Sequence, residues 1–140
     1  MNSSDGRLTL QTVEGEGLRF EAEFASGRIV LDSGSAAVAP SPVQSLLASV
    51  ATCIAMDVIG LMRKKRQSVT AYEVIMSGER AAEHPRRFLR MTLVHRLTGH
   101  GLASTAIEDA LRLTVEKYCS VYHCIRPDLP ITNRYELIEG

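Results

Sequence analysis

The segment from Val43 to Met62 constrains the fold most, because it is nearly all apolar and long enough to span a bilayer. An aspartate near a bilayer centre costs about 2.5–3.5 kcal/mol to insert, and Asp57 lies inside this segment. A helix that is apolar nearly all round is otherwise buried in a core or between subunits. We therefore expect a buried central helix, in a protein that does not enter the membrane.

The ends of this helix carry start and stop signals. Ser41 suits the N-cap and Pro42 suits the first helical position. The four basic residues 63–66 suit the C-terminus, where the partial negative charge of a helix favours cations. The predicted apolar face consists of Leu46, Leu47, Val50, Ile54, Val58 and Leu61.

Strand patterns flank the helix on both sides. Before it, residues 8–10, 18–24 and 28–31 alternate with a period of two, with a turn at residues 14–17, which predicts an antiparallel meander followed by a loop over residues 32–41. After the helix we expect strands with Tyr72, Val74 and Met76, and then Leu89, Met91, Leu93 and Leu97, facing inward.

A second helix and a last strand complete the predicted order. Thr105 and Glu108 form a capping-box pattern for a second helix. Its predicted buried side consists of Ile107, Leu111, Thr114 or Val115, and Tyr118. Residues 131–138 make a closing strand. This order predicts an α+β fold in which helices cover one face of antiparallel sheets, with all 140 residues in a single domain.

The charge balance and the cysteine count narrow the function. Sixteen basic and sixteen acidic side chains leave no one-sign field that would favour nucleic acid as a partner. The N-terminus lacks a basic stretch followed by an apolar one, which predicts a cytoplasmic protein. In such a protein the three cysteines are expected to be reduced at rest, and paired thiols are more often reactive than structural.

Cys53 and Cys119 are the candidate reactive thiols. Cys53 alone, in the most apolar helix, is more simply interpreted as a small buried hydrophobe with an inert thiol. Cys119 lies where the second helix is expected to break and restart, which gives a thiol access and nearby backbone N–H groups. Two thiols on packed helices can form a disulfide if their Cα atoms lie within roughly 7 Å.

The remaining cysteine and the histidines have simpler interpretations. Cys124 can pair with Cys119 or join His123 in a metal site, but the spacing matches no usual zinc pattern, so we expect no bound metal. His95 falls on the inward face of its strand and is expected to be a hydrogen-bonded core histidine. His84 and His100 lie at turns and are expected to be solvated.

Several motifs together resemble the OsmC/Ohr family. Residues 41–48 and 52–58 are similar to its central-helix signature, in which a proline eleven residues before the first cysteine opens the helix. Residues 83–88 and 97–102 resemble the hairpin of the YhfA-like OsmC branch, and residues 116–121 resemble that branch's second-cysteine motif.

The resemblance implies an intertwined homodimer, with sheets wrapped around two central helices, and a thiol-dependent peroxidase. By this resemblance, the Cys53 thiolate is expected to attack an organic hydroperoxide and become a sulfenic acid, and Cys119 is expected to condense with it to a disulfide. The resemblance further implies that an external dithiol of the lipoyl type resets the pair and that the protein needs no bound cofactor.

Departures from the family pattern keep other functions open. Val43 and Gln44 stand where family branches carry a glutamate that orients an arginine, and Arg7, Arg19 and Arg28 are the candidate substitutes. Asp57 lies one turn after Cys53, where a carboxylate opposes thiolate formation. The alternatives are a non-catalytic protein of the same fold that binds a small apolar ligand or acts as a slow redox sensor, and a purely structural interaction domain.

Overall fold

The protein forms two compact units, residues 1–46 and 47–140, and the boundary falls within the first helix. The computed structural model describes residues 4–11, 15 and 17–140. The predicted turn at residues 14–17 lies in part outside the described residues.

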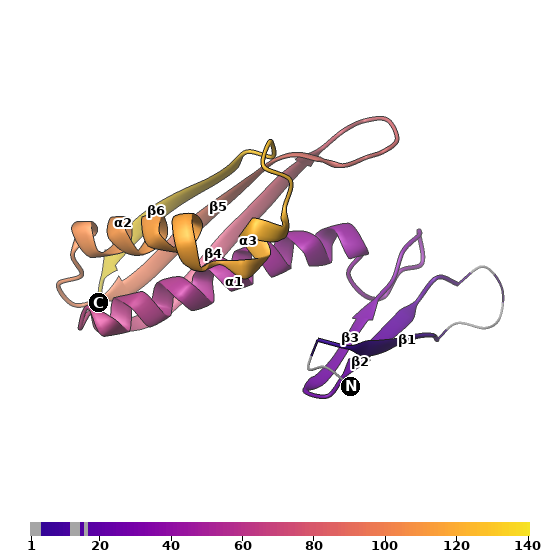
Figure 1. The fold of residues 1–140 in the computed structure, drawn as a ribbon, viewed down its shortest axis with the longest axis horizontal. Helices are drawn as coiled ribbons and strands as arrows, with labels where there is room; N and C mark the ends of the chain where they lie inside the picture. The colour runs from indigo at the N-terminus through magenta and orange to yellow at the C-terminus, as the bar shows by residue number, and fades with distance from the viewer. Residues whose placement is uncertain (1–3, 12–14, 16) are drawn as a thin grey trace. The chain divides into compact units, whose positions relative to one another are not determined.

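The first unit holds the predicted antiparallel meander. Its strands are β1 (Gly6–Leu10), β2 (Phe20–Phe24) and β3 (Gly27–Leu31), paired in that order (Figure 1). Within one chain this small sheet leaves apolar side chains exposed on β1 and β3, among them Leu8 and Ile29. The loop after β3 is organised by Asp32, whose carboxylate accepts the backbone N–H groups of Ser33 and Val38 at 2.8 and 3.1 Å.

The central helix α1 runs from Pro42 to Lys64, as its start and stop signals predict. Ser41 and Gln44 form a reciprocal capping box. The Ser41 N–H donates to Gln44 Oε1 at 2.9 Å, and the Gln44 N–H donates to Ser41 Oγ at 3.1 Å. Among the described helices, α1 is the one that is long and apolar enough to cross a membrane, judged by length and composition only. The predicted face is partly correct, because Leu46 is 41% exposed; the buried residues are Val50, Ala51, Ile54, Val58 and Met62.

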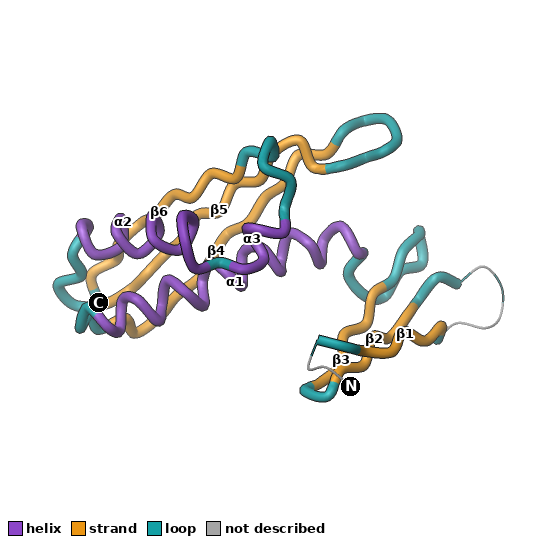
Figure 2. Tube along the Cα trace, viewed as in Figure 1, coloured by secondary structure: helices purple, strands orange, loops and turns teal. Residues whose placement is uncertain are grey.

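The second unit places helices on one face of a three-stranded sheet (Figures 1 and 2). β4 (Val69–Arg80) and β5 (Phe88–Gly99) form the predicted antiparallel hairpin. β6 (Ile131–Glu139) pairs with the other edge of β5 in parallel, so the expectation of purely antiparallel sheets is wrong for this strand. The helical segment between β5 and β6 is long enough to return the chain to the start of β5, as a parallel crossover requires. The α+β class is confirmed.

The core of this unit lies under β5. Met91, Leu93 and Leu97 are fully buried on one face of the strand, as predicted. His95 lies in the same row and is also fully buried. It is a hydrogen-bonded core histidine, as predicted: Tyr72 Oη lies 2.7 Å from Nδ1, and Asn133 Oδ1 lies 2.8 Å from Nε2. Burial lowers the pKa of His95.

The second helix ends in an irregular turn. α2 (Ser104–Leu113) continues into a π-helical turn, η1 (Thr114–Tyr118), and the short helix α3 (Ser120–Cys124) follows. The predicted capping box is wrong: Ala103 is the N-cap and its side chain forms no cap hydrogen bond. Glu108 accepts instead from the Tyr135 hydroxyl at 2.5 Å. Tyr118 is 47% exposed, contrary to prediction, because the π turn shifts the helical phase before it.

Candidate functional site

Cys53 lies in the middle of α1, and its side chain is partly buried. Its neighbour Ile54 is fully buried in the core, so the register of α1 fixes where the Cys53 sulfur points. Asp57 follows one turn later, and residues four apart on a helix share a face. The helix therefore presents one thiol and one carboxylate side by side.

Cys119 lies at the break between η1 and α3, as predicted. Its backbone N–H closes the π turn on the Thr114 carbonyl at 2.9 Å, and its own conformation is extended. It then acts as the N-cap of α3, where its sulfur accepts the Tyr122 N–H at 3.3 Å. The break releases the sulfur from the helical pattern, and the residue is fully buried.

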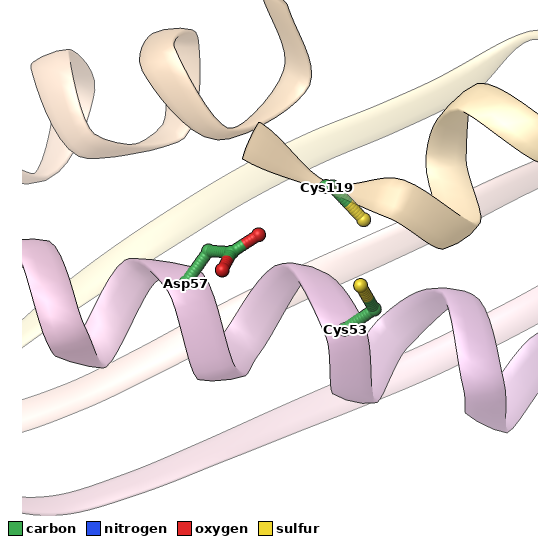
Figure 3. A group of neighbouring side chains, drawn as sticks. All are labelled: Cys53, Asp57 and Cys119. Atoms are coloured by element: carbon green, nitrogen blue, oxygen red, sulfur yellow. The ribbon is translucent and has the colours of Figure 1, made fainter. Parts of the chain in front are cut away.

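The structure brings Cys53, Asp57 and Cys119 together (Figure 3). One ligand atom from each, the two Sγ atoms and a carboxylate oxygen, all lie within 4.8 Å of one another. Both cysteines are free thiols, and their sulfurs point toward each other from α1 and from the break. An S–S bond measures about 2.05 Å, so a disulfide between them requires the two sulfurs to move closer together.

The electrostatics of the cluster oppose ionisation of Cys119. Burial raises the pKa of Cys119 to about 12, and a hydrogen bond with the Cys53 side chain adds to this. The Tyr122 N–H lowers the pKa and the Asp57 carboxylate raises it, both as smaller effects. The sequence correctly predicts the backbone N–H contact, but burial outweighs it.

Asp57 has one unsatisfied oxygen. Its Oδ2 is buried and finds no hydrogen-bond partner among the described residues. A buried acceptor without a donor carries its full desolvation cost, which is about 1–3 kcal/mol and more for a charged group. The cluster therefore holds a carboxylate that lacks the compensation buried polar groups normally have.

The other predicted site residues lie in different surroundings. Gln44 caps the start of α1, so its side-chain oxygen is already engaged with the Ser41 N–H. Arg28 forms ion pairs with Glu21 and Glu23 in the first unit. Cys124 is exposed at the end of α3, and among the described residues the group of three metal-ligating side chains contains Cys53, Asp57 and Cys119, without Cys124 or His123.

Sequence reasoning missed an apolar groove in the second unit. It has a volume of about 370 Å³ and lies between α1 and β4. Its lining includes Met56, Ile59, Tyr72, Val74 and Met76. Met56 is 66% exposed and lies outside the apolar face predicted for α1.

Comparison with known proteins decides the family. The family model described as "OsmC-like protein" matches residues 33–134. The chain belongs to the OsmC family. This OsmC protein is 40% identical to Protein YhfA of Escherichia coli K12 over 124 residues, covering 88% of this chain and 92% of YhfA.

Solved structures share the fold of this OsmC protein. A hypothetical protein from Aquifex aeolicus VF5 superposes with a TM-score of 0.86 at 24% identity, covering 100% of this chain and 99% of the other. An organic hydroperoxide resistance protein OsmC from Legionella pneumophila has a TM-score of 0.65 at 15% identity, covering 97% of this chain and 99% of that one. At these identities the likeness concerns the fold.

Proposed function

We propose that this protein is a thiol-dependent peroxidase that reduces organic hydroperoxides through Cys53 and Cys119. The observation that carries the proposal is the approach of the two reduced sulfurs, from separate elements, to within 4.8 Å. A solved structure of the same fold is described as an organic hydroperoxide resistance protein and a predicted redox protein, which supports the same class of chemistry.

The two thiols have different surroundings, which assigns their roles. Cys53 is partly accessible and is the nucleophile that meets the peroxide. Cys119 is fully buried and burial raises its pKa, so it is the weaker nucleophile of the reduced pair and takes the resolving role. A resolving thiol placed beside the peroxidatic one limits further oxidation of the sulfenic acid.

The cycle balances without a bound cofactor. The Cys53 thiolate attacks the distal oxygen of the hydroperoxide, the O–O bond breaks, and the alkoxide takes a proton and leaves as the alcohol. The Cys119 sulfur then attacks the sulfenic sulfur, an S–S bond forms and water leaves. An external dithiol of the lipoyl type reduces the disulfide by exchange and is itself oxidised to a disulfide.

The proposal includes a cytoplasmic homodimer. A second copy covers the exposed apolar side chains around the groove of α1 and β4, where Met56 and Met76 are 66% and 45% exposed. This explains the apolar character of α1 by a subunit interface instead of a membrane, because apolar faces of this kind mark interaction sites. Sedimentation of the reduced protein tests it, and a monomer at micromolar concentration would contradict it.

Mass spectrometry of the non-reduced protein tests the peroxidase half-reaction. We expect one equivalent of cumene hydroperoxide to produce a Cys53–Cys119 disulfide in the wild type and in Cys124→Ser, and none in Cys53→Ser. Two free thiols in the wild type after prolonged exposure would refute the proposal. The Cys124→Ser variant is the matched control, because its thiol is exposed and outside the cluster.

A redox sensor that oxidises once and does not turn over is the second candidate function. The observation favouring it is the Asp57 carboxylate, which repels a sulfur anion in the cluster. Steady-state turnover with dihydrolipoamide separates the two functions. A peroxidase consumes many equivalents of hydroperoxide per protein, and a sensor consumes one.

A further inference from the structure

The cluster of Cys53, Asp57 and Cys119 also has the donor atoms of a metal site. We propose that the reduced protein binds one Zn²⁺ per chain through the two sulfurs and the Asp57 carboxylate, and that this metal holds the thiol pair inactive. The binding site stands on the structure alone. Its inhibitory role rests on the proposed peroxidase function.

The separation of the donor atoms fits a tetrahedral zinc site. Zinc binds sulfur at about 2.3 Å and carboxylate oxygen at about 2.0–2.2 Å, which places tetrahedral ligands roughly 3.6–3.8 Å apart. The three donor atoms already lie within 4.8 Å of one another. Side-chain rotations that move these atoms by about an ångström would bring them to zinc-ligand separations. The fourth position remains open to water, as in zinc sites with three protein ligands.

The unsatisfied oxygen of Asp57 is an independent observation that points to a cation. Asp57 Oδ2 is buried and without a hydrogen-bond partner among the described residues, on the side of α1 that faces Cys119 (Figure 3). Buried charged groups are normally paired or bound to metals. A divalent ion between Asp57 and the sulfurs supplies the missing partner and balances two of the three negative charges that two thiolates and the carboxylate bring.

The chemistry of the donors selects the ion. Two thiolates and one carboxylate disfavour magnesium and calcium, which prefer oxygen ligands, and favour zinc among the common divalent ions. The protein supplies these ligands from α1 and from the break before α3, so binding also ties the two elements together. Cys124 and His123 are outside the cluster, and the proposed site does not use them.

Metal binding and the thiol cycle exclude each other. In the disulfide neither sulfur is a thiolate, so the oxidised protein loses two of its three zinc ligands. In the other direction, a hydroperoxide that oxidises the zinc-bound pair consumes two thiolates, one ROOH and two protons, and it yields the disulfide, ROH, water and free Zn²⁺. Zinc therefore slows oxidation of Cys53, and oxidation releases zinc.

Competition with a chromophoric chelator measures Zn²⁺ binding to the reduced, metal-free protein. We expect one ion per chain, at least about 100-fold weaker binding in Cys53→Ser and Cys119→Ser, and about 10–100-fold weaker binding in Asp57→Asn. Cys124→Ser is the matched control and keeps wild-type affinity. Co²⁺ in the same site gives the absorption bands of tetrahedral thiolate coordination.

The outcomes separate the metal site from the peroxidase. Zinc binding that survives in Asp57→Asn at wild-type affinity, or that is lost in Cys124→Ser, overturns the proposed site. Peroxidase activity measured with a chelator tests the catalytic function without the metal. If the protein binds zinc as expected and the chelated protein reduces no hydroperoxide, the metal site stands and the peroxidase falls. If the chelated protein is active and zinc at saturation does not slow it, the inhibitory role is overturned.

Discussion

Replacing Asp57 by asparagine removes the negative charge of the cluster and keeps the shape of the side chain. The carboxylate oxygen lies within 4.8 Å of the Cys119 sulfur. At that separation two unit charges interact by about 3.5 kcal/mol with an effective dielectric constant of about 20, and by about 0.9 kcal/mol in bulk water. Because Asp57 is partly exposed, the interaction lies between these limits. The pKa of Cys119 should therefore fall in Asp57→Asn, by an amount near the bulk-water end of this range, because the Asp57 charge is the smallest of the influences on that pKa.

The measurement needs a background in which Cys119 is the one remaining thiol. Cys53→Ser/Cys124→Ser provides it, since these are the other two cysteines. Ultraviolet absorbance of the thiolate, followed against pH with and without Asp57→Asn, gives the two pKa values of Cys119. An unchanged or raised pKa in Asp57→Asn would refute the reasoning, because it would mean that the carboxylate carries no charge in the cluster. Circular dichroism at each pH confirms that the fold persists.

Three further predictions concern the cycle, the core and the cap. In Cys119→Ser the cycle should stop after the first step and accumulate a Cys53 sulfenic acid that dimedone traps. If no sulfenic acid is trapped, Cys53 is not the nucleophile. Since burial lowers the pKa of His95 below its ordinary 6.5, the unfolded state binds a proton there that the folded state does not. The free energy of unfolding should thus fall as pH drops below that value, by up to about 1.4 kcal/mol per unit, and His95→Gln should remove this part of the slope in urea titrations. Ser41→Ala should cost about 0.5–2 kcal/mol of stability through the lost capping bond, and a loss below this range in the same titrations would contradict the capping box.

Local patterns predicted most of the elements. The period-two alternation located the strands of the first sheet, and Ser41 with Pro42 located the start of α1. The spacing of Cys53 and Asp57 placed both on one side of the helix. These predictions succeed because each depends on neighbouring residues in one element, where side-chain direction follows from the backbone period.

The failures concern contacts between distant segments. The parallel pairing of β6 with β5 depends on the path of the whole connection between them, which no local pattern encodes. Thr105 and Glu108 have the spacing of a capping box, but Glu108 bonds to Tyr135, which is far away in sequence. The proximity of Cys119 to Cys53 came from the family resemblance, because the residues alone permitted the pair without requiring it.

The π-helical turn before Cys119 is equivalent to one residue inserted into an ordinary helix. Each residue of an α-helix advances the side chains by about 100° around the axis. Deleting one residue between Thr114 and Tyr118 would restore the regular winding and swing the following thiol by that angle, away from α1. The length of this turn therefore bears on where the Cys119 thiol points, and removing one residue from it should weaken or abolish formation of the Cys53–Cys119 disulfide.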